Sequence, residues 1–174
     1  MDESQQILFL SLYKPVHHQL SKFCRAISGN KEDAEDLMND TILNVIEHFD
    51  RINNKDSFKW YMFRSAINLN KMKMRRNKFL AEFDEKEIRC FVDSGNNPEA
   101  ILEYKMIYEE ILSLPSRTSE SLILFHISDL SLEEIQRIQG GSLSGVKLRL
   151  KRGRDKLLSN RCDEISKISV VQLF

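Results

Sequence analysis

The residues of this chain best suited to a chemical task lie near its C-terminus, where cations recur along one predicted helix. At about 100° per residue, four small or apolar residues between positions 143 and 158 share one narrow stripe: Val146, Leu150, Gly153 and Leu157. Outside this stripe lie four cations that could face a nucleic acid, with only Asp155 opposing them: Lys147, Lys151, Arg152 and Lys156. One face of the helix can therefore pack while the other meets phosphates and base edges. The alternative is a solvated charged face on an ordinary bundle helix.

The elements before this helix are typical of a helix-turn-helix, the motif that places its second helix in the major groove of DNA. Ser131 followed by Glu134 is a capping box, which predicts a helix over 132–139. Gly140 and Gly141 then predict a turn before the basic helix over 143–158. Because glycine loses more conformational freedom on ordering than other residues, we expect Gly141 and Gly145 to loosen that helix.

A second basic tract lies between Asp56 and Glu82, a stretch that contains no acidic residue. Aromatic residues alternate with its cations, an arrangement suited to stacking on unpaired bases. A helical projection of 58–78 predicts a packing stripe of Phe58, Met62, Ala66, Leu69 and Met72. The opposite side holds Trp60, Arg64, Ile67, Lys71 and Arg75. This side favours single-stranded nucleic acid, unless Trp60 packs beneath a neighbouring helix as most tryptophans do.

The charges of the chain are informative through their positions, because 26 basic and 26 acidic residues give a net charge of zero. Residues 31–50 hold seven acidic side chains and a single lysine, whereas the two tracts above are basic. Such separation indicates an acidic surface for a protein partner and basic surfaces for nucleic acid.

The sequence offers no catalytic, metal or cofactor site, so we expect a protein that is not an enzyme. Cys24, Cys90 and Cys162 are far apart and odd in number, which fits a reducing cytosol and a cytoplasmic protein. None of the four histidines has a second ligand at metal-binding spacing. The N-terminus lacks the cationic start of a signal peptide, and the apolar run over 7–12 is too short to span a membrane.

The hydrophobic periodicity predicts an all-α fold of two small helical domains joined by a flexible linker. Helices are expected over 5–27, 31–49, 58–78, 98–113, 116–128, 132–139 and 143–158. Pro15 is expected to kink or split the first helix. Alternating charge and turn residues predict a linker over 82–97, between domains over 1–81 and 98–160. Residues 161–174 form a C-terminal tail in this interpretation.

These segments, in this order, resemble a bacterial RNA polymerase sigma factor of the extracytoplasmic-function (ECF) group, over about residues 9–158. Residues 33–43, DAEDLMNDTIL, are similar to the family's pattern for gripping the clamp coiled coil of core polymerase. Residues 58–69, FKWYMFRSAINL, with Arg75 and Arg76, are similar to the region that melts the promoter and reads its minus-ten element. Residues 97–115, 130–135 and 146–154 resemble the domain that binds the minus-thirty-five element.

The resemblance implies a role for individual residues. Core polymerase would be contacted by Asp36, Leu37, Asn39 and Asp40. The melted non-template strand would be met by Trp60, Arg64 and Asn68, and its phosphates by Lys71, Arg75 and Arg76. The upstream duplex would be met by Lys147, Leu148, Lys151 and Arg152. Leu148 stands where relatives commonly have a polar residue, so its contact would be apolar.

The implied function is a transcription initiation factor that binds core RNA polymerase at its clamp and flap, recognises promoter DNA and helps to open it. An anti-sigma protein is a further candidate partner, and no insertion into a membrane is expected. A stand-alone helix-turn-helix regulator is the alternative, but it leaves the acidic segment and the Trp60 face without a role. A helical protein-interaction module that has lost DNA binding is a third hypothesis.

Overall fold

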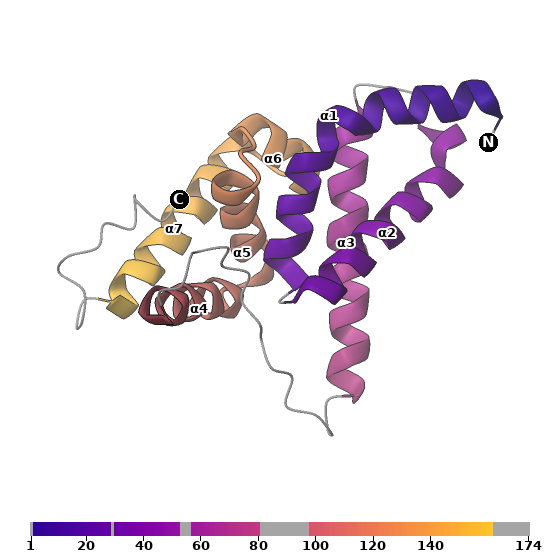
Figure 1. The fold of residues 1–174 in the computed structure, drawn as a ribbon. Coiled ribbons are helices and arrows are strands. Elements are labelled where there is room, and N and C mark those ends of the chain that lie inside the picture. The colour runs from indigo at the N-terminus through magenta and orange to yellow at the C-terminus, as the bar shows by residue number, and fades with distance from the viewer. Residues whose placement is uncertain (1, 29, 53–56, 81–97, 162–174) are drawn as a thin grey trace. The chain divides into compact units, whose positions relative to one another are not determined.

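The computed structural model contains two compact units of packed helices (Figure 1). It describes residues 2–28, 30–52, 57–80 and 98–161. The predicted linker over 82–97 and the tail beyond residue 161 lie outside these ranges. The described residues form helices, turns and bends without a strand, which confirms the all-α prediction. None of their helices is both long and apolar enough to cross a membrane.

The first unit consists of α1 (Glu3–Ser28), α2 (Lys31–Glu47), the short 3₁₀ turn η1 (Phe49–Arg51) and α3 (Phe58–Leu80). Figure 1 shows a bend within α1, the expected effect of Pro15, which removes one backbone donor from the helix. Asn30 caps α2 by accepting a hydrogen bond from the backbone N–H of Asp33 at 2.7 Å. The helix predicted over 31–49 therefore starts as expected, but it ends at Glu47 and continues as the 3₁₀ turn.

Aromatic rings hold the three helices of this unit together. Phe9 of α1 lies edge-on to Phe49 and to Phe58, with ring centroids 5.6 Å apart in both pairs. Phe23 of α1 meets Phe63 of α3 in the same geometry at 5.5 Å. Edge-to-face pairs stabilise a core by about 0.5–1.5 kcal/mol beyond the burial of their area. The starts of α1 and α3 are therefore fixed against the end of α2.

The packing of α3 corrects the predicted stripe. Phe58, Met62 and Ala66 are buried as expected, but so are Phe63 and Ile67, which had no place in it. At the other end of the stripe, Leu69 is only half-buried and Met72 is 58 % exposed. The reason is that α3 packs against both α1 and α2, so a wide arc is buried near its start. A projection that assumes one packing side divides such a helix wrongly.

The second unit consists of α4 (Pro98–Ser113), α5 (Ser116–Leu122), the π-helical turn η3 (Ile123–Ile127), α6 (Leu132–Gln139) and α7 (Leu143–Arg161). The helix predicted over 116–128 is thus an α-helix with a π-helical end. Ser128 closes that turn by donating its backbone N–H to the carbonyl of Ile123 at 3.0 Å. Asp129 then takes a φ of 54°, which ends the helix and redirects the chain towards α6.

A close contact between α5 and α7 sets the position of the C-terminal helix. Gly153 of α7 faces Thr118 and Leu122 of α5, and a Cβ atom at Gly153 would lie 2.9 Å from a methyl carbon of each. Glycine is therefore required by space rather than by its φ angle. Without a side chain at this point, the two helices approach more closely than most side chains would permit.

Candidate nucleic-acid and partner-binding surfaces

The two faces of α7 are divided as the sequence predicts. Val146, Leu150 and Leu157 are at most 4 % exposed, and Gly153 is buried with them. The residues predicted to face nucleic acid are all exposed: Lys147, Leu148, Lys151 and Arg152. Burial on one side and cationic exposure on the other give α7 the form of a reader helix.

The turn before α7 requires its glycines. Gly140 has a φ of 73° and Gly141 a φ of 88°, a region that residues with a side chain rarely adopt. Ser142 then caps α7, because its Oγ accepts a hydrogen bond from the backbone N–H of Gly145 at 3.1 Å. Gly141 therefore has the conformation that the turn needs. Whether Gly141 and Gly145 also loosen α7 stays a prediction.

A buried hydrogen-bond network fixes α6 against its neighbours in the helix-turn-helix. Gln139, the last residue of α6, accepts from Ser121 of α5 at 2.8 Å and from Arg149 of α7 at 3.0 Å, both at its Oε1. Its Nε2 donates to the carbonyl of Arg117 at 3.1 Å. One buried amide thus joins three helices, and losing it would leave polar groups unpaired, each at about 1–3 kcal/mol. The network holds α7 in one orientation relative to α6.

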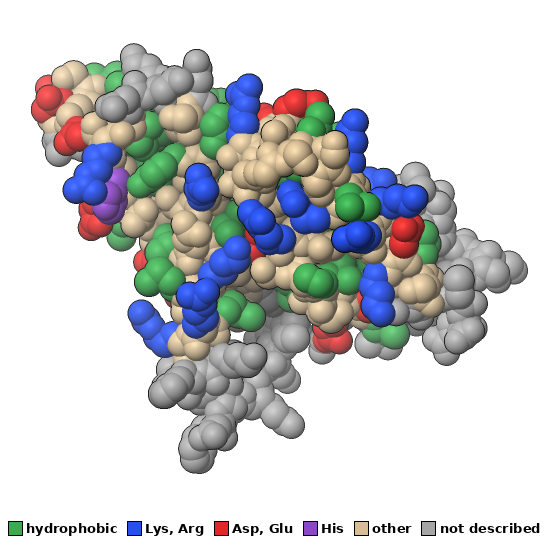
Figure 2. Space-filling model, turned by 180° about the vertical axis from the view of Figure 1, so that it is seen from behind, with side chains coloured by type: hydrophobic (Ala, Val, Ile, Leu, Met, Phe, Trp, Pro, Cys, Tyr) green, Lys and Arg blue, Asp and Glu red, His purple; other side chains and the backbone are tan. Residues whose placement is uncertain are grey.

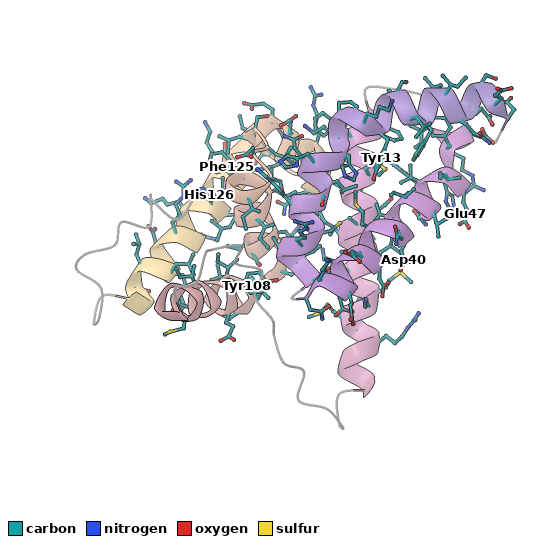
Figure 3. All side chains as sticks on the ribbon, viewed as in Figure 1. Tyr13, Asp40, Glu47, Tyr108, Phe125 and His126 are labelled. Atoms are coloured by element: carbon teal, nitrogen blue, oxygen red, sulfur yellow. The ribbon has the colours of Figure 1, made fainter. Side chains whose placement is uncertain are left out.

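A second cluster positions an arginine of α7. Arg154 donates from Nε and Nη2 to Nε2 of His126, at 3.2 and 3.1 Å, so the imidazole proton lies on Nδ1. The guanidinium carbon lies 5.6 Å from the centre of the Phe125 ring. Figure 3 shows Phe125 and His126 next to each other, and their rings meet edge to face at 4.9 Å. Burial, and second the charge of Arg154, lower the pKa of His126 from 6.5 to about 4.

This cluster should make the stability of the second unit fall in mildly acidic solution. Between pH 6.5 and 4 the unfolded chain binds a proton at His126 that the folded unit does not, so stability is complete above pH 6.5 and declines towards pH 4. We expect the urea midpoint, followed by circular dichroism, to fall over this range. His126→Gln keeps an acceptor for Arg154 but cannot titrate, so its midpoint should fall less. An equal fall in both proteins would contradict the prediction.

The predicted single-strand face of α3 is only partly exposed. Arg64, Asn68, Arg75 and Arg76 are exposed, whereas Trp60 and Lys71 are half-buried. Five of these six lie within an arc of about 80° and form the α3 face: Trp60, Arg64, Asn68, Lys71 and Arg75. Arg76 falls outside this arc. Lys59 places its ammonium 5.6 Å from the centre of the Trp60 ring, so the indole already has a cation beside it.

The acidic helix α2 presents one exposed stripe. Residues at helical spacing compose it, and we call it the α2 stripe: Asp36, Asn39, Asp40, Leu43 and Glu47. Figure 3 marks Asp40 and Glu47 on this helix. Leu37 does not belong to it, because it is only 2 % exposed and packs in the core. The sequence prediction of Leu37 as a contact residue therefore does not fit its position, and the exposed Leu43 had not been predicted.

Lys73 joins the basic helix α3 to the acidic helix α2. Its Nζ lies 2.8 Å from Oδ1 of Asp33 and 3.8 Å from Oδ2 of Asp36. Asn30 donates to the other oxygen of Asp33 at 2.8 Å. Asp33 is thus held by its own chain and serves the packing of α2, whereas the side chain of Asp36 remains 69 % exposed. A partner of α2 would meet Asp36 with Lys73 beside it.

The exposed surface of the described residues carries both cationic and apolar side chains. Figure 2 shows a face on which Lys and Arg side chains stand among exposed hydrophobic ones. Among the residues that the structure describes, no group of three His, Cys, Asp or Glu side chains could hold a metal ion. Burial raises the pKa of the Cys24 thiol to about 12, which leaves it protonated and unreactive.

Sequence reasoning missed the residues that position these surfaces: Gln139, Arg149, His126 and Lys73. One signal was available, because Gln139 follows Leu132 by seven residues and Ile135 by four and so stands in a packing stripe. A polar residue in such a place usually has a buried partner. No pattern pointed to Lys73, whose partner comes from another helix.

Two family models match the chain. The model for sigma-70 region 2 matches residues 12–79, and that for sigma-70 region 4 matches residues 104–157. Among curated relatives, the ECF RNA polymerase sigma factor SigW of Bacillus subtilis (strain 168) is 28 % identical over 160 residues, covering 85 % of this chain and 84 % of SigW. EcfG of Rhodopseudomonas palustris (strain TIE-1), of the same description, is 27 % identical over 138 residues, covering 79 % and 76 %.

Solved structures share the fold. The sigma factor RpoE of Bartonella quintana, in complex with the anti-sigma factor NepR, superposes with a TM-score of 0.70 at 22 % identity, covering 87 % of this chain and 94 % of RpoE. CnrH, in complex with the cytosolic domain of CnrY, gives 0.66 at 22 % identity, covering 92 % and 91 %. A stand-alone helix-turn-helix regulator does not account for the region 2 match. The chain therefore belongs to the sigma-70 family, as an ECF RNA polymerase sigma factor that acts in transcription initiation.

Proposed function

We propose that three surfaces of this sigma factor divide the work of initiation. The α2 stripe binds the clamp of core RNA polymerase, with Asp36, Asn39 and Asp40 as polar contacts. Leu37 supports this surface from below. The exposed side of α7 binds the upstream promoter duplex through Lys147, Leu148, Lys151 and Arg152. The observation that carries the proposal is the separation of α7 into a fully buried side and a cationic exposed side.

The α3 face is the proposed contact for the melted non-template strand. Trp60 and Asn68 suit bases, because an aromatic ring stacks on them and an amide can donate to and accept from one base edge. Arg64, Lys71, Arg75 and Arg76 would neutralise phosphates along the strand. The neighbouring Lys59 keeps a positive charge beside the indole, which favours an anionic ligand there.

Two further partner contacts are proposed from the family. The second unit would bind the polymerase flap, as the resemblance to sigma factors implies. An anti-sigma protein would occupy the free chain, since one similar solved structure is described as a sigma factor in complex with an anti-sigma factor. If so, adding that protein should reduce binding to core polymerase in a competition titration.

Transcription with purified components tests the proposal. Core RNA polymerase is incubated with fragmented genomic DNA, with and without the chain, and transcript starts are mapped. We expect discrete starts that require the chain and share two upstream elements. Core binding is measured in parallel by titration. The absence of chain-dependent starts despite core binding would overturn the assignment of the DNA surfaces, and absent core binding would overturn that of the α2 stripe.

The salt dependence of promoter binding tests the α7 cations. Lys151→Ala and Arg152→Ala should each weaken binding and lower the slope of log affinity against log salt by about 0.9, if each side chain neutralises one phosphate. Titrations of the chain with core polymerase on promoter duplex, at four salt concentrations, give the slope. Lys14→Ala removes an exposed lysine of α1 and should leave it unchanged. Unchanged slopes in the α7 variants would remove them from the phosphate contacts.

A further inference from the structure

Leu148 is an exposed leucine at the centre of a cationic surface. It is 45 % exposed on α7, with Lys151 and Arg152 one turn further along. At 100° per residue it lies about 160° from both Val146 and Leu150, hence opposite the middle of the packing side. It takes no part in the core, and it projects from the middle of the exposed side.

A leucine at this position can make favourable contacts with only a few groups of DNA. It has no hydrogen-bonding atom, so it cannot satisfy the donors and acceptors that guanine, cytosine and adenine present in the major groove. Facing one of them, it would leave a polar group without a partner. The C5-methyl group of thymine is the apolar feature of that groove, and apolar side chains contact it.

The position of Leu148 along α7 also suits a base contact. It lies in the second turn of the helix, and recognition helices contact base edges with residues near their N-terminus. By helical geometry Lys151 and Arg152 stand about 60° and 40° to either side of it. Cations on both flanks can hold the phosphate backbones while the residue between them reaches the groove floor.

We propose that Leu148 selects thymine at one base pair of the upstream promoter element by contact with its C5-methyl group. This inference rests on the proposed function of α7 as the duplex reader. It assigns Leu148 a part in specificity and assigns its charged neighbours a part in affinity.

Deoxyuridine substitution tests the contact, because uracil lacks only the methyl group of thymine. The full chain is bound to core polymerase and titrated with promoter duplexes in which each thymine of the upstream element is replaced in turn. We expect one position, or two adjacent ones, to lose about three- to tenfold in affinity, as suits the loss of one buried methyl group. Leu148→Ala should bind the thymine and uracil duplexes equally.

A matched control uses the other exposed leucine of the same helix. Leu158 is 48 % exposed near the end of α7, and Leu158→Ala should keep the full preference for thymine. An upstream element without thymine, equal binding of every uracil duplex by the unaltered chain, or a preference that survives Leu148→Ala would each overturn the proposal. If the unaltered chain with core polymerase does not bind promoter duplex at all, the proposed function itself is wrong, and the inference fails with it.

Discussion

Gly153→Val should unfold the second unit at a much lower urea concentration while leaving the first unit intact. The new side chain would begin 2.9 Å from Thr118 Cγ2 and Leu122 Cδ1. Leu122 is confined in the core and threonine is rigid at χ1, so neither can withdraw. Overpacking of this kind costs about 3 kcal/mol. A domain of some 60 residues has a stability of only about 3–10 kcal/mol, so the loss is a large fraction of it.

Two spectroscopic signals separate the units in this experiment. Trp60 is the only tryptophan of the chain and lies in the first unit, so its fluorescence reports that unit alone. Circular dichroism reports the helices of both. The expected result is a shifted dichroism transition with an unchanged fluorescence transition. Gly145→Val is the control, because the nearest atoms at Gly145 are side-chain ends of Ser142 and Arg149, at 3.3 and 3.6 Å. Similar shifts in both variants would contradict the packing argument.

Asp40→Arg should weaken the binding of core polymerase by about tenfold to a hundredfold without changing the fold. Asp40 is exposed in the α2 stripe, and it makes no hydrogen bond or ion pair with the described residues. Reversing its charge removes an attraction and adds a repulsion at the proposed interface, whereas an exposed substitution changes stability by about 0.5 kcal/mol or less. Titration against labelled core polymerase measures the affinity, and thermal unfolding measures the stability.

Two companion variants define the extent of this surface. Glu47→Arg reverses a charge two turns further along the α2 stripe and shows how far the contact extends. Lys14→Glu reverses a charge at an exposed position of α1, outside the α2 stripe, and should leave core affinity unchanged. If Asp40→Arg binds core polymerase as tightly as Lys14→Glu does, the α2 stripe is not the polymerase surface.

The residues of α7 illustrate what the sequence can predict. This helix packs on one side only, so the period of its apolar residues identifies the buried stripe completely. The same reasoning failed for Ile67 and Met72 of α3. There, burial depends on two neighbouring helices near the start of α3, and a single period cannot represent two packing directions.

Contacts between helices account for most of what could not be predicted. Gln139 is hydrogen-bonded to Ser121, 18 positions before it, and to Arg149, 10 positions after it. The bond from Arg149 to Ser121 spans 28 positions. The pairing of Lys73 with Asp33 likewise depends on how α2 and α3 cross. Local sequence patterns do not predict contacts between residues so far apart in the chain. The same holds for Gly153, whose need for space becomes visible only with α5 in place.

The division of α7 into two sides has a consequence for how such a protein can evolve. In many proteins, substitutions that change function also reduce stability. Positions 147, 148, 151 and 152 are exposed, so substitutions there disturb no buried contact. On the proposed role of these residues in promoter binding, a duplicated gene could therefore acquire a new promoter preference through single substitutions on this side, with every intermediate still folded. The same proposed role would let an engineer exchange the four residues to obtain factors that read different promoters from one scaffold.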